Sequence, residues 1–172
     1  MTTFIALFRG INVGGKNRLV MKELVALMEN CGYENIQTYI QSGNVVFESK
    51  ENPDSNLGLL IEEKFGFKPE ILILTRSELE LAFDNNPYKE VEGKLCHLYF
   101  CQEQPDSIDR EKLKRLKLDS EQYFIHHKTF YLYAPDGFGR SKLAANVEKC
   151  LAVPATARNL NTARRLLEMV RY

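Results

Sequence analysis

A glycine-rich segment near the N-terminus carries residue types that bind phosphate in many proteins. Within Phe8–Asn17, Gly10 is followed after four residues by Gly15 and Lys16, the G-x-x-x-x-G-K spacing of the phosphate-binding loop of nucleotide hydrolases. The next residue is Asn17, so the hydroxyl that binds magnesium in that motif is missing. The segment therefore does not predict a nucleotide hydrolase.

The same segment has the features of an anion site that needs no metal. Glycines accept positive φ angles and let a ligand approach the backbone closely, and consecutive N–H groups in such a loop can bind an anion. A helix follows, and the N-terminal end of a helix favours negative charge. A glycine turn that merely joins a strand to a helix is the alternative. The residues that we expect at the anion are Arg9, Asn12, Gly14, Gly15, Lys16 and Asn17.

Patterns of apolar residues indicate which strands and helices position this loop. Residues 3–9 predict a buried strand, and the apolar spacing from Met21 to Met28 predicts a helix that ends at Gly32. Two strands around a Ser-Gly-Asn turn, a second helix, a fourth strand and a third helix complete the first half. A capping box is expected at residues 77–80.

The second half of the chain repeats this order of strands and helices. Corresponding hairpin turns and final helices lie about 84 to 85 residues apart, close to half of the chain. The order is that of the ferredoxin-like plan. We therefore predict an α+β fold, a tandem pair of ferredoxin-like β-α-β-β-α-β units, each followed by an extra helix. The first unit is expected at residues 1–88 and the second at residues 89–172.

The predicted topology brings a second segment close to the loop. In a split β-α-β order the first and second strands run parallel, so the loop after the first strand and the hairpin turn share one edge of the sheet. Ser42 and Asn44 in that turn are therefore further candidate ligands, although Ser-Gly-Asn is also ordinary turn chemistry. The connection after the first strand is about five residues longer than its counterpart, as functional loops often are.

A third candidate segment lies near the C-terminus. Arg158 and Asn159 are candidates to hold a carboxylate or a phosphate, because arginine can contact either anion with two parallel hydrogen bonds. The last helix is expected to begin at Asn161 or Thr162, either of which could cap it.

Composition narrows the class of protein. The net charge is zero, whereas broad nucleic-acid binding requires a strongly basic face, so nucleic acid is not the expected partner. The first apolar run is too short for a signal peptide or a membrane span, so a cytoplasmic protein without membrane contact is expected. The four cysteines show no C-x-x-C spacing, so neither a metal nor another cofactor is predicted.

Three segments together resemble a known family. The segments FIALFRGINVGGKN, TYIQSGNVVF and TARNLNT are similar to those of the bacterial domain-of-unknown-function family numbered 1697, and the resemblance covers almost the whole chain. It implies a two-part α+β fold and brings no activity, substrate or catalytic residue. The family usually has an aromatic residue after Arg-Asn, where this chain has Leu160.

The sequence thus predicts a protein that binds a small anionic ligand, phosphorylated or nucleotide-like, at the Gly10–Asn17 loop. A nucleic-acid-binding module and a structural or protein-interaction domain without a ligand remain the alternatives. No residue pattern identifies a nucleophile, a general base or a reaction, and none indicates an oligomeric state.

Overall fold

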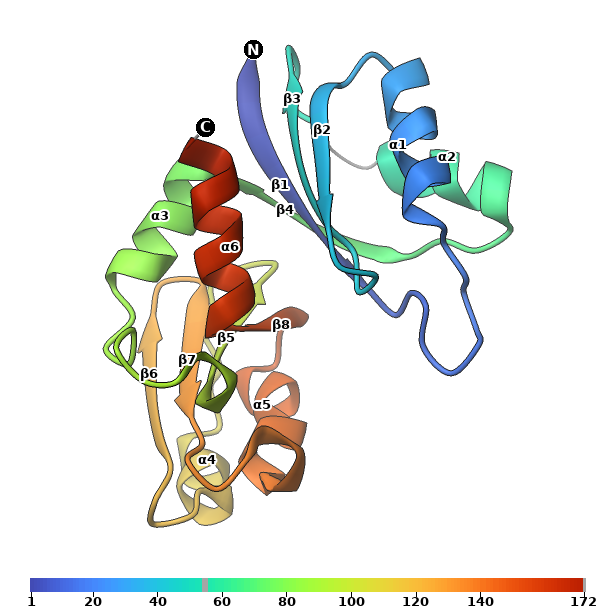
Figure 1. Cartoon of the computed structure of the whole chain (residues 1–172). Helices are drawn as coiled ribbons and strands as arrows, with labels where there is room; N and C mark the ends of the chain where they lie inside the picture. The colour runs from blue at the N-terminus through green and yellow to red at the C-terminus, as the bar shows by residue number, and fades with distance from the viewer. Residues whose placement is uncertain (54–55, 172) are drawn as a thin grey trace. The chain divides into compact units, whose positions relative to one another are not determined.

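The computed structural model describes residues 1–53 and 56–171 (Figure 1). It contains two four-stranded antiparallel sheets, with strand orders β2-β3-β1-β4 and β6-β7-β5-β8. The elements in chain order are β1 (Thr2–Arg9), α1 (Met21–Asn30), β2 (Glu34–Tyr39), β3 (Asn44–Ser49), α2 (Asn56–Phe65), β4 (Glu70–Thr75), α3 (Arg76–Asp84), η1 (Gly93–Leu95), β5 (Cys96–Cys101), α4 (Arg110–Leu116), β6 (Gln122–His126), β7 (Thr129–Tyr133), η2 (Phe138–Arg140), α5 (Lys142–Leu151), β8 (Ala155–Asn159) and α6 (Leu160–Arg171).

The first sheet has its central strand, β1, between β3 and β4. Phe4 faces Phe47 of β3 and Thr75 of β4 in the register of these antiparallel pairs. Helices α1 and α2 lie on one side of this sheet (Figure 1). Alternate residues of β1 and β3 pack against the apolar stripe of α1, for example Phe4 and Phe47 with Leu24. This core fixes the direction of β1, and therefore the place where the loop after β1 begins.

The second sheet repeats this arrangement, with β5 between β7 and β8. One face packs against α4 and α5 through a core that includes Tyr99, Leu113 and Val147. On the opposite face, the Tyr131 hydroxyl donates to the Ala82 carbonyl of α3 at 2.6 Å. The order of elements confirms the predicted α+β fold with two β-α-β-β-α-β units, each followed by a helix.

The chain divides into two compact units that are not contiguous in sequence. The first comprises Met1–Leu79 and Leu166–Tyr172, and the second comprises Glu80–Arg165. Residues 80–88 thus group with the second unit, and the end of the chain groups with the first. The division at residue 88 that the repeat predicts remains a prediction about the domains, because each extra helix has residues in both units.

The extra helices begin earlier than the capping patterns predict. Thr75 and Glu78 form the capping box of α3: the Thr75 N–H donates to Glu78 Oε2 at 2.8 Å, and the Glu78 N–H donates to Thr75 Oγ1 at 3.2 Å. In α6, Asn159 Oδ1 accepts from the Thr162 N–H at 2.9 Å. The predicted caps at Ser77 and at Asn161 or Thr162 are therefore wrong, because the last strand residue caps each helix.

The connection from β5 to α4 is also longer than predicted. It covers residues 102–109, whereas the connection from β1 to α1 covers residues 10–20. The difference is therefore about three residues rather than five. Asp109 is the cap of α4 and accepts from the Lys112 N–H at 3.0 Å.

Candidate functional site

The loop after β1 is anchored at both of its ends. Ile11 and Leu19 are buried in the core beneath α1, while all residues from Val13 to Arg18 are exposed. Gly10 has a φ angle of 75°, which turns the chain away from the strand direction. The two apolar anchors therefore hold a short exposed segment at the end of the sheet.

The exposed segment is a small β-hairpin. Val13 and Lys16 form an antiparallel bridge, and the Lys16 N–H donates to the Val13 carbonyl at 3.0 Å. Gly14 and Gly15 between them have φ angles of 58° and 74°, as a two-residue type I′ turn requires. The two glycines thus close a turn.

Backbone hydrogen bonds inside the loop limit its use as an anion cradle. The Asn12 N–H donates to the Asn17 carbonyl at 3.1 Å, and the Lys16 N–H is used within the turn. These two N–H groups are therefore not available to an anion in the way that the glycine spacing suggests. The loop therefore offers fewer backbone donors to an anion than the glycine spacing suggests.

The Asn12 side chain forms hydrogen bonds that connect the loop to the segment before α1 and to the β2–β3 turn. Its Nδ2 donates to the Leu19 carbonyl at 3.0 Å and to the Gln41 carbonyl at 2.8 Å, and its Oδ1 accepts from the Leu19 N–H at 2.8 Å. Asn17 Nδ2 donates to the Gly10 carbonyl at 3.0 Å. Both predicted amide ligands are thus engaged in holding the loop in one conformation.

The loop and the β2–β3 turn lie at the same end of the sheet, as the topology predicts. Besides the bond to Gln41, the Phe8 N–H donates to the Gly43 carbonyl at 2.9 Å. Ser42 is exposed in this turn. Asn44 is fully buried, and its Nδ2 donates to the Tyr39 carbonyl at 3.0 Å and to Ser42 Oγ at 3.4 Å. Asn44 therefore shapes the turn instead of facing solvent.

Basic side chains surround the hairpin. Arg9 Nη1 lies 3.4 Å from Glu70 Oε2. Lys16 and Arg18 are exposed, and neither forms an ion pair within residues 1–53 and 56–171. Lys22 is exposed in the first turn of α1. Lys16, Arg18 and Lys22 are therefore cations for which the described part of the chain provides no partner acid.

The start of α1 adds partial positive charge. Val20 occupies the N-cap position and forms no capping hydrogen bond through its side chain. The first N–H groups of a helix have no partner within the helix, and the helix dipole places partial positive charge there. Glu23 is the acidic residue of this first turn. The loop therefore ends at an uncapped helix terminus.

Arg158 and Asn159 belong to the second unit. They lie on β8, opposite Leu98 and His97 of β5. Arg158 Nη1 donates to the Ala157 carbonyl at 2.9 Å, and burial lowers the pKa of its guanidinium to about 10. Asn159 caps α6. These two residues therefore lie outside the unit that carries the loop.

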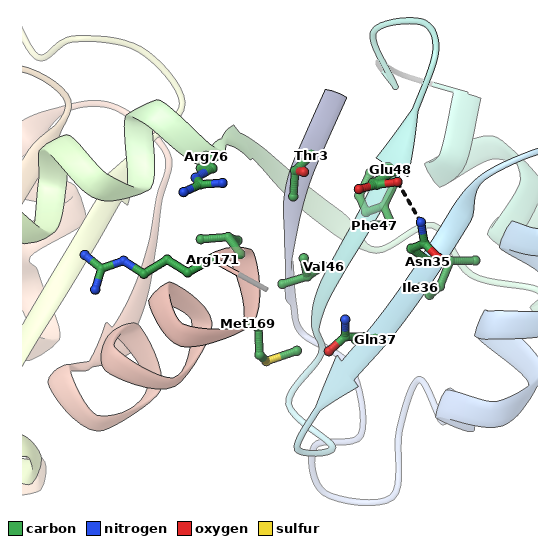
Figure 2. Close-up of a pocket in the computed structure, with 11 residues that line it drawn as sticks. Thr3, Asn35, Ile36, Gln37, Val46, Phe47, Glu48, Arg76, Met169 and Arg171 are labelled. Carbon is green, nitrogen blue, oxygen red and sulfur yellow. Dashed lines mark hydrogen bonds between the residues drawn. The ribbon is translucent and has the colours of Figure 1, made fainter. Parts of the chain in front are cut away.

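A groove that the sequence did not indicate lies in the first unit. It has a volume of about 510 Å³ and is formed by β1, β2, β3, the start of α3 and the end of α6. Figure 2 shows Arg76 and Arg171 on one side and the hydrogen bond from Asn35 Nδ2 to Glu48 Oε2, 2.7 Å long, on the other. None of the predicted site residues lines this groove.

Two titratable side chains outside the loop, His97 and Cys101, are partly or fully buried and take part in packing. Burial lowers the pKa of His97 to about 4, and its ring stacks on Phe138 at a centroid distance of 3.6 Å. Burial raises the pKa of the Cys101 thiol to about 12, with a smaller contribution from Glu148. Among the described residues, no cluster of three or more His, Cys, Asp or Glu side chains could hold a metal ion.

Comparison with known proteins identifies the family to which the chain belongs. The sequence model of the family described as "Protein of unknown function (DUF1697)" matches residues 1–131. The chain belongs to this family. A search of curated proteins finds no match to this DUF1697 protein. A solved structure, described as that of the conserved bacterial protein SP0830 from Streptococcus pneumoniae, is similar, with 26% identity, a TM-score of 0.70 and coverage of 98% of each chain.

The lengths and compositions of the helices show whether any of them could cross a membrane. Among the described residues of this DUF1697 protein, no helix has the length and apolar character needed to cross a bilayer.

Proposed function

We propose that this DUF1697 protein binds a small anionic ligand, phosphorylated or nucleotide-like, at the surface formed by the Gly10–Asn17 loop and the start of α1. One observation carries the proposal: side-chain hydrogen bonds hold the loop in place, while Lys16 and Arg18 stay exposed without an acidic partner among the described residues. Cations that are held apart from acids attract an anion without first breaking an ion pair.

The proposed roles follow from what each residue contacts. Lys16 and Arg18 supply the charges that bind the ligand, and arginine can contact a phosphate with two parallel hydrogen bonds. Lys22 and the free N–H groups at the start of α1 favour a second negative charge. Asn12 and Asn17 position the loop through their amides. A ligand with two or more negative charges therefore suits this surface better than a single carboxylate.

The neighbouring turn and Arg9 have smaller proposed roles. Ser42 is exposed beside the loop, and its hydroxyl is a further possible donor to a phosphate. Arg9 already lies 3.4 Å from Glu70, so its contribution to binding requires that this exposed pair opens. Exposed ion pairs are worth less than about 1 kcal/mol, so the opening costs little.

A thermal-shift titration tests the proposal directly. The probes are inorganic phosphate, pyrophosphate and adenosine diphosphate, each with sodium chloride at matched ionic strength as the control. A probe present at about 100 times its dissociation constant stabilises the fold by about 2.7 kcal/mol. Absence of stabilisation by all three probes contradicts the proposal.

A pair of lysine variants locates the site. Lys16→Ala is expected to lower the affinity for the best probe about ten- to a hundredfold, because one charge-assisted hydrogen bond is lost, and to change stability by no more than about 0.5 kcal/mol. Lys50→Ala is the matched control, since Lys50 is also exposed but follows β3 at the opposite end of the sheet. Equal affinities in the two variants would place binding elsewhere.

Two further expectations belong to this proposal. Short RNA is expected to bind weakly, and steep salt dependence of a strong RNA complex would favour a nucleic-acid module instead. The expected cytoplasmic location is tested by fractionating cells that produce the tagged protein.

A further inference from the structure

The second sheet ends in an edge strand that carries an exposed aromatic side chain. β6 lies at one edge of the β6-β7-β5-β8 sheet. Tyr123 and Ile125 pack against the core on the α4 and α5 side, whereas Phe124 is 43% exposed. Its ring lies against Tyr131, at a centroid distance of 6.1 Å. An edge strand also presents unpaired backbone N–H and C=O groups, so β6 offers both hydrogen bonds and an apolar contact.

The other three edge strands differ from β6. β2 is interrupted by a register shift around Asn35, whose φ angle is 50°. β4 begins with the charged Glu70, and β8 carries Arg158. Bulges and charges are common means by which edge strands avoid pairing with another chain. The register of β6 is regular, and Gln122–His126 contains no acidic residue, lysine or arginine.

Charges of opposite sign flank the two ends of β6. Asp119 is exposed before the strand, where the Ser120 hydroxyl also donates to Asp136 Oδ2. His127 and Lys128 are exposed after the strand. When two β6 strands run antiparallel with Phe124 at the centre, the hairpin turn that carries Lys128 in one copy lies at the same end of the paired strands as the turn that carries Asp119 in the other copy. The acidic end of each strand thus meets the basic end of its counterpart.

We propose that β6 is a self-association edge, where two copies of this chain pair antiparallel about a two-fold axis at Phe124 and join their sheets. Residues directly opposite in an antiparallel pair have Cβ atoms about 4.5–5.5 Å apart, so the two phenyl rings make contact at the centre. The charge pattern selects the antiparallel arrangement, because parallel strands would bring like charges together. A contact formed by one pair of five-residue strands buries little surface, so we expect a weak dimer that forms only at high concentration. This inference is independent of the proposed anion site.

Sedimentation velocity over a series from low-micromolar to near-millimolar chain concentrations tests the dimer. The unmodified chain is expected to shift from monomer to dimer. Phe124→Lys is expected to raise the dimer dissociation constant at least about 100-fold, because it removes the central aromatic contact. Leu59→Lys is the matched control: Leu59 is 52% exposed on α2, and its replacement is expected to leave the dimer unchanged. A chain that stays monomeric throughout, or two variants that behave alike, would overturn the proposal.

A charge-exchange experiment tests the register without changing Phe124. At low salt, Lys128→Glu and Asp119→Lys are each expected to raise the dissociation constant about tenfold, because each places like charges together at both ends of the symmetric contact. The double variant is expected to return to within about threefold of the unmodified chain. Circular dichroism checks that all variants are folded. A double variant that binds no better than the single ones would refute the antiparallel pairing.

Discussion

The side-chain amide of Asn12 donates a hydrogen bond to the Gln41 carbonyl at 2.8 Å. This contact joins the loop after the first strand to the turn between the second and third strands, 29 residues further along the chain. The same side chain bonds the backbone of Leu19 in both directions. One asparagine therefore fixes the start of α1 relative to the end of the sheet where the β2–β3 turn lies.

Asn12→Ala is expected to destabilise the protein by about 2–4 kcal/mol. Each net hydrogen bond contributes about 1 kcal/mol, and alanine at the positive φ of Asn12, 53°, adds about 1 kcal/mol of strain. Urea unfolding measures the effect. Asn12→Gly removes the same hydrogen bonds without that strain, so it is expected to be the milder change. If alanine and glycine variants were both as stable as the original chain, the amide would not hold the loop.

Gly43→Ala is expected to be strongly destabilising, by about 3 kcal/mol or more. A Cβ atom at this position would lie 2.6 Å from both Ile11 Cδ1 and Phe8 Cβ, and the φ angle is 88°. Overpacking and left-handed strain therefore add. Gly14→Ala is the matched control, because its φ of 58° is similar in sign but no atom lies within 4 Å of the added Cβ.

The expected cost of Gly14→Ala is about 1 kcal/mol, from strain alone. The measurement is again the free energy of unfolding in urea. Equal losses in the two glycine variants would show that close contact around Gly43 contributes nothing beyond the backbone angle.

Thr75→Ala is expected to cost about 1 kcal/mol, whereas Ser77→Ala is expected to change stability by no more than about 0.5 kcal/mol. Thr75 exchanges hydrogen bonds with Glu78 at the start of α3, and loss of a helix cap has about this cost. Ser77 lies within the first turn and is exposed. Thermal unfolding of the two variants side by side decides between them, and a larger loss in Ser77→Ala would restore the cap that the sequence pattern favours.

His97 is expected to make the protein less stable as the pH falls from about 6.5 to about 4. Its pKa is about 4 in the folded chain because burial disfavours the imidazolium, and about 6.5 in the unfolded chain. Between these values the unfolded chain binds a proton that the folded chain does not, so stability falls with decreasing pH by at most about 1.4 kcal/mol per pH unit.

The matching experiment compares urea unfolding across this pH range in two histidine variants. His97→Phe keeps an aromatic ring against Phe138 and is expected to remove this part of the pH dependence. His127→Asn is the control, since His127 is exposed and asparagine tolerates its positive φ. An unchanged pH profile in His97→Phe would mean that His97 is not the group responsible.

The order of elements could be predicted from the sequence because it depends on local signals. The apolar spacing of α1 and the glycines that end helices are short-range features. The turns at Ser42–Asn44 and at His127 define the two hairpins. The spacing of these signals alone predicts two copies of one plan, because the two halves share no obvious residue identity.

Helix starts were harder to predict because strand and helix follow each other without a break. Thr75 ends β4 and Asn159 ends β8, and each caps the helix that begins at the next residue. The apolar pattern assigns such a residue to its strand, so the next polar residues are taken as the cap. The two actual caps, Thr75 and Asn159, lie 84 residues apart, so the repeat spacing holds although both predicted caps are wrong.

The detailed geometry of the loop depends on contacts that the local sequence does not specify. Whether an N–H group points to a ligand or to a carbonyl is decided by Asn12, whose partner Gln41 is distant in sequence. The groove cannot be predicted from the sequence for the same reason. Its lining comes from five elements, with Thr3 near one terminus and Arg171 near the other, so no motif spacing connects them.

The assignment of Leu166–Tyr172 to the first unit affects any attempt to dissect the chain. A fragment that ends at residue 88 lacks Leu166, Met169 and Val170, all of which are buried, and the groove wall that Met169 and Val170 provide beside Val46. Such a fragment exposes apolar surface and is expected to aggregate. The first unit is therefore expected to be complete only after the residues of α6 that belong to it have been synthesised.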